Sequence, residues 1–144
     1  MSDSVSEHVH ASTVAIDGRA VLITGPSGSG KSDLALRLID RGFILVGDDH
    51  TIVRRDGDRL VASAPARIAG KLEVRGIGIV EMETASDVPV ALLVELTSEI
   101  ERLPEDKRKS AILGVSLPLV SIDAQAASAP AKVALALDRI GLKF

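Results

Sequence analysis

The chain has 144 residues, enough for one compact domain with a sizeable core. Its formal net charge is −3, it contains two Phe and no Tyr or Trp, and it therefore lacks the basic and aromatic surface that nucleic-acid binding needs. Zero Cys excludes disulfides, thiolate metal sites and cysteine catalysis. No apolar run reaches membrane-spanning length and no signal peptide is recognisable, so we expect a soluble, cytoplasmic protein with neither a membrane nor a nucleic-acid partner.

Residues 1–9 are polar and expected to be a flexible N-terminus, and residues 10–144 are expected to form a single domain. The beginning of this domain predicts a hairpin. Residues 13–16 predict a short strand, which the Asp17-Gly18 turn joins to a second, buried strand over residues 19–24.

A complete phosphate-binding loop follows that strand. Its sequence is Gly25-Pro26-Ser27-Gly28-Ser29-Gly30-Lys31-Ser32, which fits the form G-x-x-x-x-G-K-[ST]. The glycines allow backbone N–H groups to point at phosphate oxygens, Lys31 can neutralise the β- and γ-phosphates, and the Ser32 hydroxyl can ligate Mg²⁺. A helix is predicted over residues 32–41, so strand, loop and helix come in the order that the motif requires. This setting favours nucleoside triphosphate binding over a glycine-rich turn that matches by chance.

The rest of the chain alternates strands and helices. Extended segments are predicted over residues 43–47, 52–55, 59–63, 71–75, 77–80, 89–96 and 112–122, residues 97–110 read as an exposed loop or short helix, and a last helix capped by Ser128 ends at Gly141. Because antiparallel hairpins are mixed with a phosphate-loop core, we expect an α/β fold with a mixed β-sheet and flanking helices.

Acidic residues near the loop are candidates for chemistry. Asp48 and Asp49 follow a buried strand, at the sheet edge where ligands of α/β proteins bind, and could divide the work between a metal and a general base. The alternative is an ordinary Asp turn. Glu73 lies among apolar residues and glycines in a segment that could fold close to a ligand, although a lone Glu on a strand is more often solvent-facing.

Together these segments resemble a known family. The loop, the Asp pair in Leu45-Val-Gly-Asp-Asp49, and Leu72-Glu-Val-Arg-Gly-Ile-Gly-Ile79 are similar to the catalytic domain of bacterial HPr kinase/phosphorylase, over nearly the whole chain. The resemblance implies the HPr kinase C-terminal domain fold, related to that of phosphoenolpyruvate carboxykinase. It also implies a protein serine kinase that uses ATP and Mg²⁺ to phosphorylate the phosphocarrier protein HPr, possibly with phosphorolysis in reverse, and that regulates the phosphotransferase system.

The resemblance implies a role for each matching residue. Lys31 would bind the β/γ-phosphates, and Ser32 with Glu73 would ligate Mg²⁺. Asp49, with Asp48 beside it, would take the proton from the acceptor serine. His10 stands where the family has a catalytic-site histidine, and Arg102 would stabilise charge on the transferring phosphoryl group.

The chain departs from the family pattern in several places, and these departures limit which family properties the resemblance implies. The chain resembles the short alphaproteobacterial forms, which lack the N-terminal domain of larger members. The family loop linked to phosphorolysis contains Gly-Arg-Asn, which residues 121–132 lack, and the region between Glu73 and Arg102 is shortened. Phosphorolysis and assembly into the family's homo-oligomer, a hexamer, are therefore open.

Two other function classes remain open on the sequence. One is a phosphate-loop kinase that acts on a small molecule, and the other is a non-catalytic module that senses ATP. The absence of a long insertion that could form a lid speaks against the first. The full set of Lys31, Ser32, Asp49 and Glu73 exceeds what the second requires.

Overall fold

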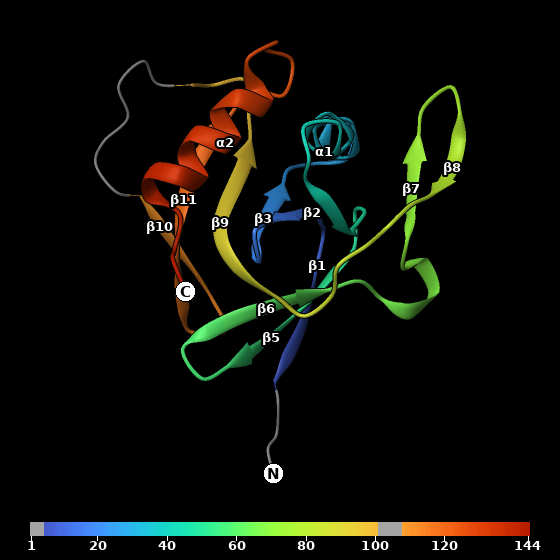
Figure 1. Cartoon of the computed structure of the whole chain (residues 1–144). Coiled ribbons are helices and arrows are strands. Elements are labelled where there is room, and N and C mark those ends of the chain that lie inside the picture. The colour runs from blue at the N-terminus through green and yellow to red at the C-terminus, as the bar shows by residue number, and fades with distance from the viewer. Residues whose placement is uncertain (1–4, 101–107) are drawn as a thin grey trace.

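The computed structural model of the chain describes residues 5–100 and 108–144 (Figure 1). In chain order its elements are β1 (Ser6–Val9), β2 (Ala11–Ile16), β3 (Arg19–Thr24), α1 (Lys31–Ile39), β4 (Ile44–Gly47), β5 (Thr51–Asp56), β6 (Arg59–Ser63), a 3₁₀ turn (Ala66–Ile68), β7 (Lys71–Val74), β8 (Gly78–Glu81), β9 (Val88–Leu96), β10 (Lys109–Ile112), β11 (Val115–Ile122) and α2 (Ala129–Ile140).

A curled, mixed sheet forms the centre of the fold. Its main strand order is β1-β5-β6-β9-β3-β2-β4, and β11 pairs with both β9 and β10. Strand β9 runs parallel to β3 and to β11, whereas β2 runs antiparallel to β3 and to β4. The expected mixed α/β fold is confirmed.

The N-terminal strand was not expected. Ser6–Val9 pairs antiparallel with Thr51–Arg54 of β5, so the prediction of a flexible stretch over residues 1–9 is wrong for these residues. Without β1, strand β5 would expose an unpaired row of backbone N–H and C=O groups at the sheet edge. That pairing uses backbone atoms of a polar segment, and therefore leaves no apolar pattern in the sequence.

Helices α1 and α2 pack on the same core cluster. In α1, Leu34, Ala35 and Leu38 are fully buried, and Val133 and Leu137 of α2 belong to the same cluster. Strands β5 and β6 contribute instead to a second cluster. Ser128 occupies the position before α2 as expected, but among the described residues its side chain makes no capping hydrogen bond.

The start of α1 is shaped by glycine. Gly30 precedes the helix with φ +101°, a left-handed conformation that strains other residues. A Cβ atom at this position would also lie 3.1 Å from the Cβ of Ala124, in the turn that follows β11. Gly30 thus lets that turn approach the phosphate-loop segment closely.

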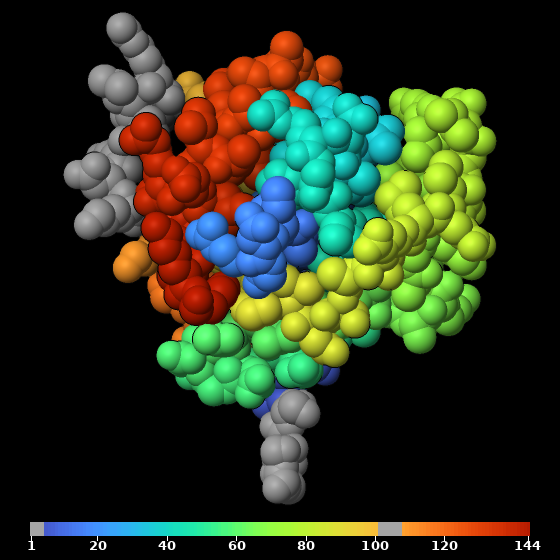
Figure 2. All heavy atoms as spheres, in the orientation of Figure 1, coloured from blue at the N-terminus to red at the C-terminus, as the bar shows by residue number. Residues whose placement is uncertain are grey.

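The β7–β8 hairpin is a separate two-stranded sheet beside α1 (Figure 1). In the space-filling view its yellow-green surface flanks the cyan surface of α1 (Figure 2). Leu72 anchors it in the interior, whereas Ile77 and Ile79 are exposed. The hairpin therefore forms one side of the region at the start of α1.

Within residues 5–100 and 108–144, neither helix has the length and apolar character needed to cross a membrane.

We expect Leu38→Ala to lower the free energy of unfolding by about 2–5 kcal/mol, because it leaves a cavity between α1 and the sheet. Leu135→Ala in α2 is the matched control, since Leu135 is 55% exposed and its truncation should cost no more than about 0.5 kcal/mol. Urea unfolding followed by circular dichroism measures both changes. Equal losses would contradict the packing described for α1.

Candidate active site

A cavity of about 700 Å³ opens at the N-terminal end of α1, within the range of small-molecule sites. Four parts of the chain line it: the phosphate-loop segment with the first turns of α1, the segment between β4 and β5, the end of β7 with the residue after it, and the turn between β11 and α2. The lining residues are Ser27, Gly28, Gly30, Lys31, Ser32, Asp33, Leu36, Arg37, Asp49, Glu73, Val74, Arg75, Ala124 and Gln125.

The phosphate-loop segment presents hydrogen-bond donors to this cavity. The first helical bond of α1 runs from Leu34 N–H to Gly30 O (2.9 Å), so the N–H groups of the preceding helical residues are available at the positive end of the helix dipole. Lys31 is 7% exposed, and its Nζ donates to Gly25 O (2.9 Å) and Pro26 O (3.3 Å). A buried ammonium beside free N–H groups is suited to bind an anion.

Asp48 connects three elements through its carboxylate. Its Oδ1 accepts hydrogen bonds from Ser32 Oγ of α1 (2.5 Å) and Ser12 Oγ of β2 (3.2 Å). Its Oδ2 accepts one from the backbone N–H of Glu73 in β7 (3.1 Å). The carboxylate therefore holds the phosphate-loop serine and the β7–β8 hairpin in one place.

Asp49 turns its carboxylate in another direction. Its backbone has φ +60°, a left-handed conformation that Asp tolerates better than most residues, and its N–H donates to Ser12 Oγ (3.0 Å). The half-exposed carboxylate lies 3.4 Å from Lys31 Nζ. Two adjacent aspartates thus serve different sides of the site, Asp48 at Ser32 and Asp49 at Lys31 and the cavity.

Side chains near Ser32 carry oxygen atoms that could hold a metal ion. Ser32 and Glu73 both line the cavity, and the Asp48 carboxylate accepts hydrogen bonds from the Ser32 hydroxyl and from the backbone N–H of Glu73. Hard oxygen ligands are those that Mg²⁺ prefers. The structure brings Glu73 to this cavity from a distant strand, as the sequence hypothesis required, and Arg75, in the turn after that strand, also lines the cavity.

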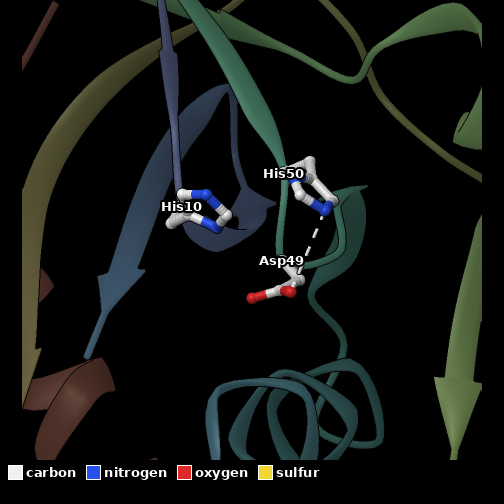
Figure 3. Close-up of side chains that lie close together, drawn as sticks. All are labelled: His10, Asp49 and His50. Carbon is white, nitrogen blue, oxygen red and sulfur yellow. Dashed lines mark ion pairs between the residues drawn. The ribbon is translucent and has the colours of Figure 1, made fainter. Parts of the chain in front are cut away.

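His10 lies between β1 and β2 and faces Asp49 together with His50 (Figure 3). One potential ligand atom from each of the three side chains lies within 4.8 Å of the others. His10 therefore lies close to Asp49, the predicted base. Arg102 falls outside the described residues.

Sequence reasoning missed Ser12 and Arg37. Ser12 is fully buried and orients both aspartates, but a serine within a strand carries no signal for this. Arg37 pairs with Asp33 (3.1 Å) and donates to Ala124 O (2.6 Å), which fixes the turn between β11 and α2 over α1. The i,i+4 spacing of Asp33 and Arg37 predicts only the ion pair.

Comparison with known proteins shows which family the chain resembles. The family model described as HPr Serine kinase C-terminal domain matches residues 3–137. The chain is 39% identical over 133 residues to an HPr kinase/phosphorylase of Chlorobium limicola and 40% identical over 133 residues to that of Chlorobaculum tepidum. Each alignment covers 83% of this chain, and 40% and 39% of those relatives, respectively.

A solved structure is similar as well. The Hpr(Ser) kinase/phosphatase from Coxiella burnetii superposes with a TM-score of 0.79 at 30% identity, over 92% of this chain and 94% of that one. The chain spans about 40% of the length of the curated relatives it matches. On the extent of these matches, the chain belongs to the family of the HPr serine kinase C-terminal domain.

Proposed function

We propose that the chain is a cytoplasmic protein serine kinase that transfers the γ-phosphoryl group of ATP to a serine of HPr, with Mg²⁺ as cofactor. The observation that carries the proposal is the pair of diverging aspartates at the phosphate loop, one at Ser32 and one at Lys31. Binding alone would not require a second carboxylate that faces the cavity. The acceptor is taken from the names of the family relatives.

The chain's own residues would hold the triphosphate and the metal. The N–H groups at the start of α1 and the Lys31 ammonium would bind the phosphates, within the cavity beside β7. Ser32 and Glu73 would hold Mg²⁺, and Asp48, which already accepts from Ser32 Oγ, would support that ligand set. The ion would offset the negative charge of the phosphates.

Asp49 would act as the general base. Its carboxylate is half-exposed at the cavity, so an acceptor hydroxyl can reach it, and His10 stands next to it on the open side. Phosphate oxygens would compete with Asp49 for Lys31, which would free the carboxylate to accept the serine proton as the phosphoryl group leaves ATP.

Other parts of the proposal rest on family resemblance. Arg102 would counter charge on the transferring group, and the protein would assemble as a homo-oligomer, a hexamer in the family. Because residues 121–132 lack Gly-Arg-Asn, the proposal is limited to the forward reaction.

Asp49→Asn should lower phosphoryl transfer to HPr by about 10²–10⁴-fold, because the amide cannot accept the serine proton. Asn keeps the left-handed backbone accessible, so nucleotide affinity should change little. Transfer is measured with γ-labelled ATP and HPr, and ATP affinity by calorimetry. Asp17→Asn is the matched control, since Asp17 has φ +52° in the β2–β3 turn and does not line the cavity.

Undiminished transfer by Asp49→Asn would show that another group is the base. Equal losses of transfer and of ATP binding would show that Asp49 only supports the nucleotide site.

Glu73→Gln should raise the Mg²⁺ concentration needed for half-maximal transfer by at least about tenfold, since even outer partners of a metal contribute about 10–100-fold to its affinity. The measurement is a magnesium titration of transfer at saturating ATP and HPr. Glu81→Gln, on the paired strand of the same hairpin, should leave the titration unchanged. A titration curve that does not move for Glu73→Gln would exclude Glu73 as a metal ligand.

A further inference from the structure

All three histidines of the chain gather at one point of the fold. His8 comes from β1, His10 follows it, and His50 lies just before β5. Their ring centroids are 5.8 Å apart for His8 and His10 and 5.0 Å apart for each of the other two pairs. The phosphoryl-transfer proposal uses only His10, so it leaves the convergence of the other two unexplained.

The cluster presents metal-ligand atoms to a shared point. His10, Asp49 and His50 each offer one ligand atom, and these atoms lie within 4.8 Å of one another (Figure 3). His50 Nε2 is 4.0 Å from Asp49 Oδ2. Ligands bound tetrahedrally to Zn²⁺ at about 2.0–2.1 Å lie about 3.3 Å apart, so this pair needs to close by less than about 1 Å. Both side chains are partly exposed and can rotate.

We propose that His10, His50 and Asp49 form a binding site for a divalent transition-metal ion of the Zn²⁺ class, with a fourth position open to water. Two imidazoles and one carboxylate are a ligand set that suits Zn²⁺ and its neighbours, whereas Mg²⁺ takes oxygen ligands. The site is therefore chemically distinct from the oxygen-lined position near Ser32.

His8 contacts the proposed ligand His50 through the ring nitrogen that would not bind the metal. Its Nε2 lies 3.0 Å from Nδ1 of His50, on the opposite side of the His50 ring from Asp49. When Nε2 of His50 binds a metal, Nδ1 carries the hydrogen, and His8 Nε2 is placed to accept it. A hydrogen-bond partner on the free ring nitrogen is the usual companion of a metal-bound histidine, and fixes the orientation of its ring.

Asp49 belongs both to this metal site and to the proposed catalytic site. Asp49 cannot bind the metal and accept a serine proton at once, so occupancy would block phosphoryl transfer. This consequence rests on the proposed function, whereas metal binding itself does not.

The test is calorimetric titration of Zn²⁺ into tag-free, chelator-treated protein without nucleotide, supported by the visible spectrum of the Co²⁺ form. Wild type should bind one equivalent, and the Co²⁺ bands should have the intensity of a four-coordinate site. His50→Gln should weaken binding by more than about tenfold, and His8→Phe by about 10–100-fold, because the latter removes only the supporting hydrogen bond. Glu73→Gln, the control for binding at the oxygen-lined position, should bind Zn²⁺ as wild type does.

The inference is overturned if wild type binds no stoichiometric Zn²⁺, if His50→Gln and His8→Phe bind it unchanged, or if Glu73→Gln abolishes it. Thermal unfolding without metal verifies that each variant is folded. If His50→Gln is not folded, the Zn²⁺ affinity of His8→Phe decides the test. Zinc binding by a protein that fails to label HPr would support the metal site and refute only the proposed kinase activity.

Discussion

The hydrogen bonds of the Asp48 carboxylate are the constraint on which the rest of the site depends. One carboxylate accepts from the phosphate-loop serine, from a buried serine of the central sheet and from the backbone of the β7–β8 hairpin. These groups come from parts of the chain that are far apart in sequence. Asp48 therefore joins two walls of the cavity, the phosphate-loop segment and the β7–β8 hairpin. Charged acceptors make stronger hydrogen bonds than neutral ones, which suits the group to this task.

The same constraint explains why two neighbouring aspartates can do different work. Ser12 Oγ donates to Asp48 and accepts from the backbone N–H of Asp49. This link holds Asp49 in a left-handed conformation and directs its carboxylate away from Ser32, toward Lys31. In an extended strand, the side chains of Asp48 and Asp49 would also point in opposite directions. The link through Ser12 in addition fixes where each carboxylate lies relative to the phosphate loop. Strained backbone at such a position is typical of functional sites.

Much of the site was predictable because its signals are local. The loop motif with its flanking strand and helix identified Lys31 and Ser32, and the position of Asp48 and Asp49 after a buried strand placed them at the ligand-binding edge. Glu73 was a candidate because it lies among apolar residues and glycines, and family resemblance implied its role at the metal, but the residues around it do not indicate that β7 packs beside α1. The cavity contains these residues or their direct partners.

The parts that were missed depend on contacts between distant segments. Strand β1 is held by backbone pairing to β5, which requires no apolar side chains in the polar segment before His10. That pairing is also what brings His8 beside His50, 42 positions away, so the histidine cluster could not be foreseen from spacing. Ser12 acts through the register of β2 against the turn after β4, which the sequence does not encode locally. Local motifs therefore predicted the candidate residues, and long-range pairing determined how these residues are arranged.

The central claim is that this cavity transfers a phosphoryl group to a protein serine. The most direct measurement is the intact mass of HPr, with the site located by peptide mapping, after incubation with this chain, ATP and Mg²⁺. The account predicts the mass increase of a single phosphoryl group, located on a serine, together with an equivalent loss of ATP. Binding of ATP by the chain without any change in the mass of HPr would contradict it.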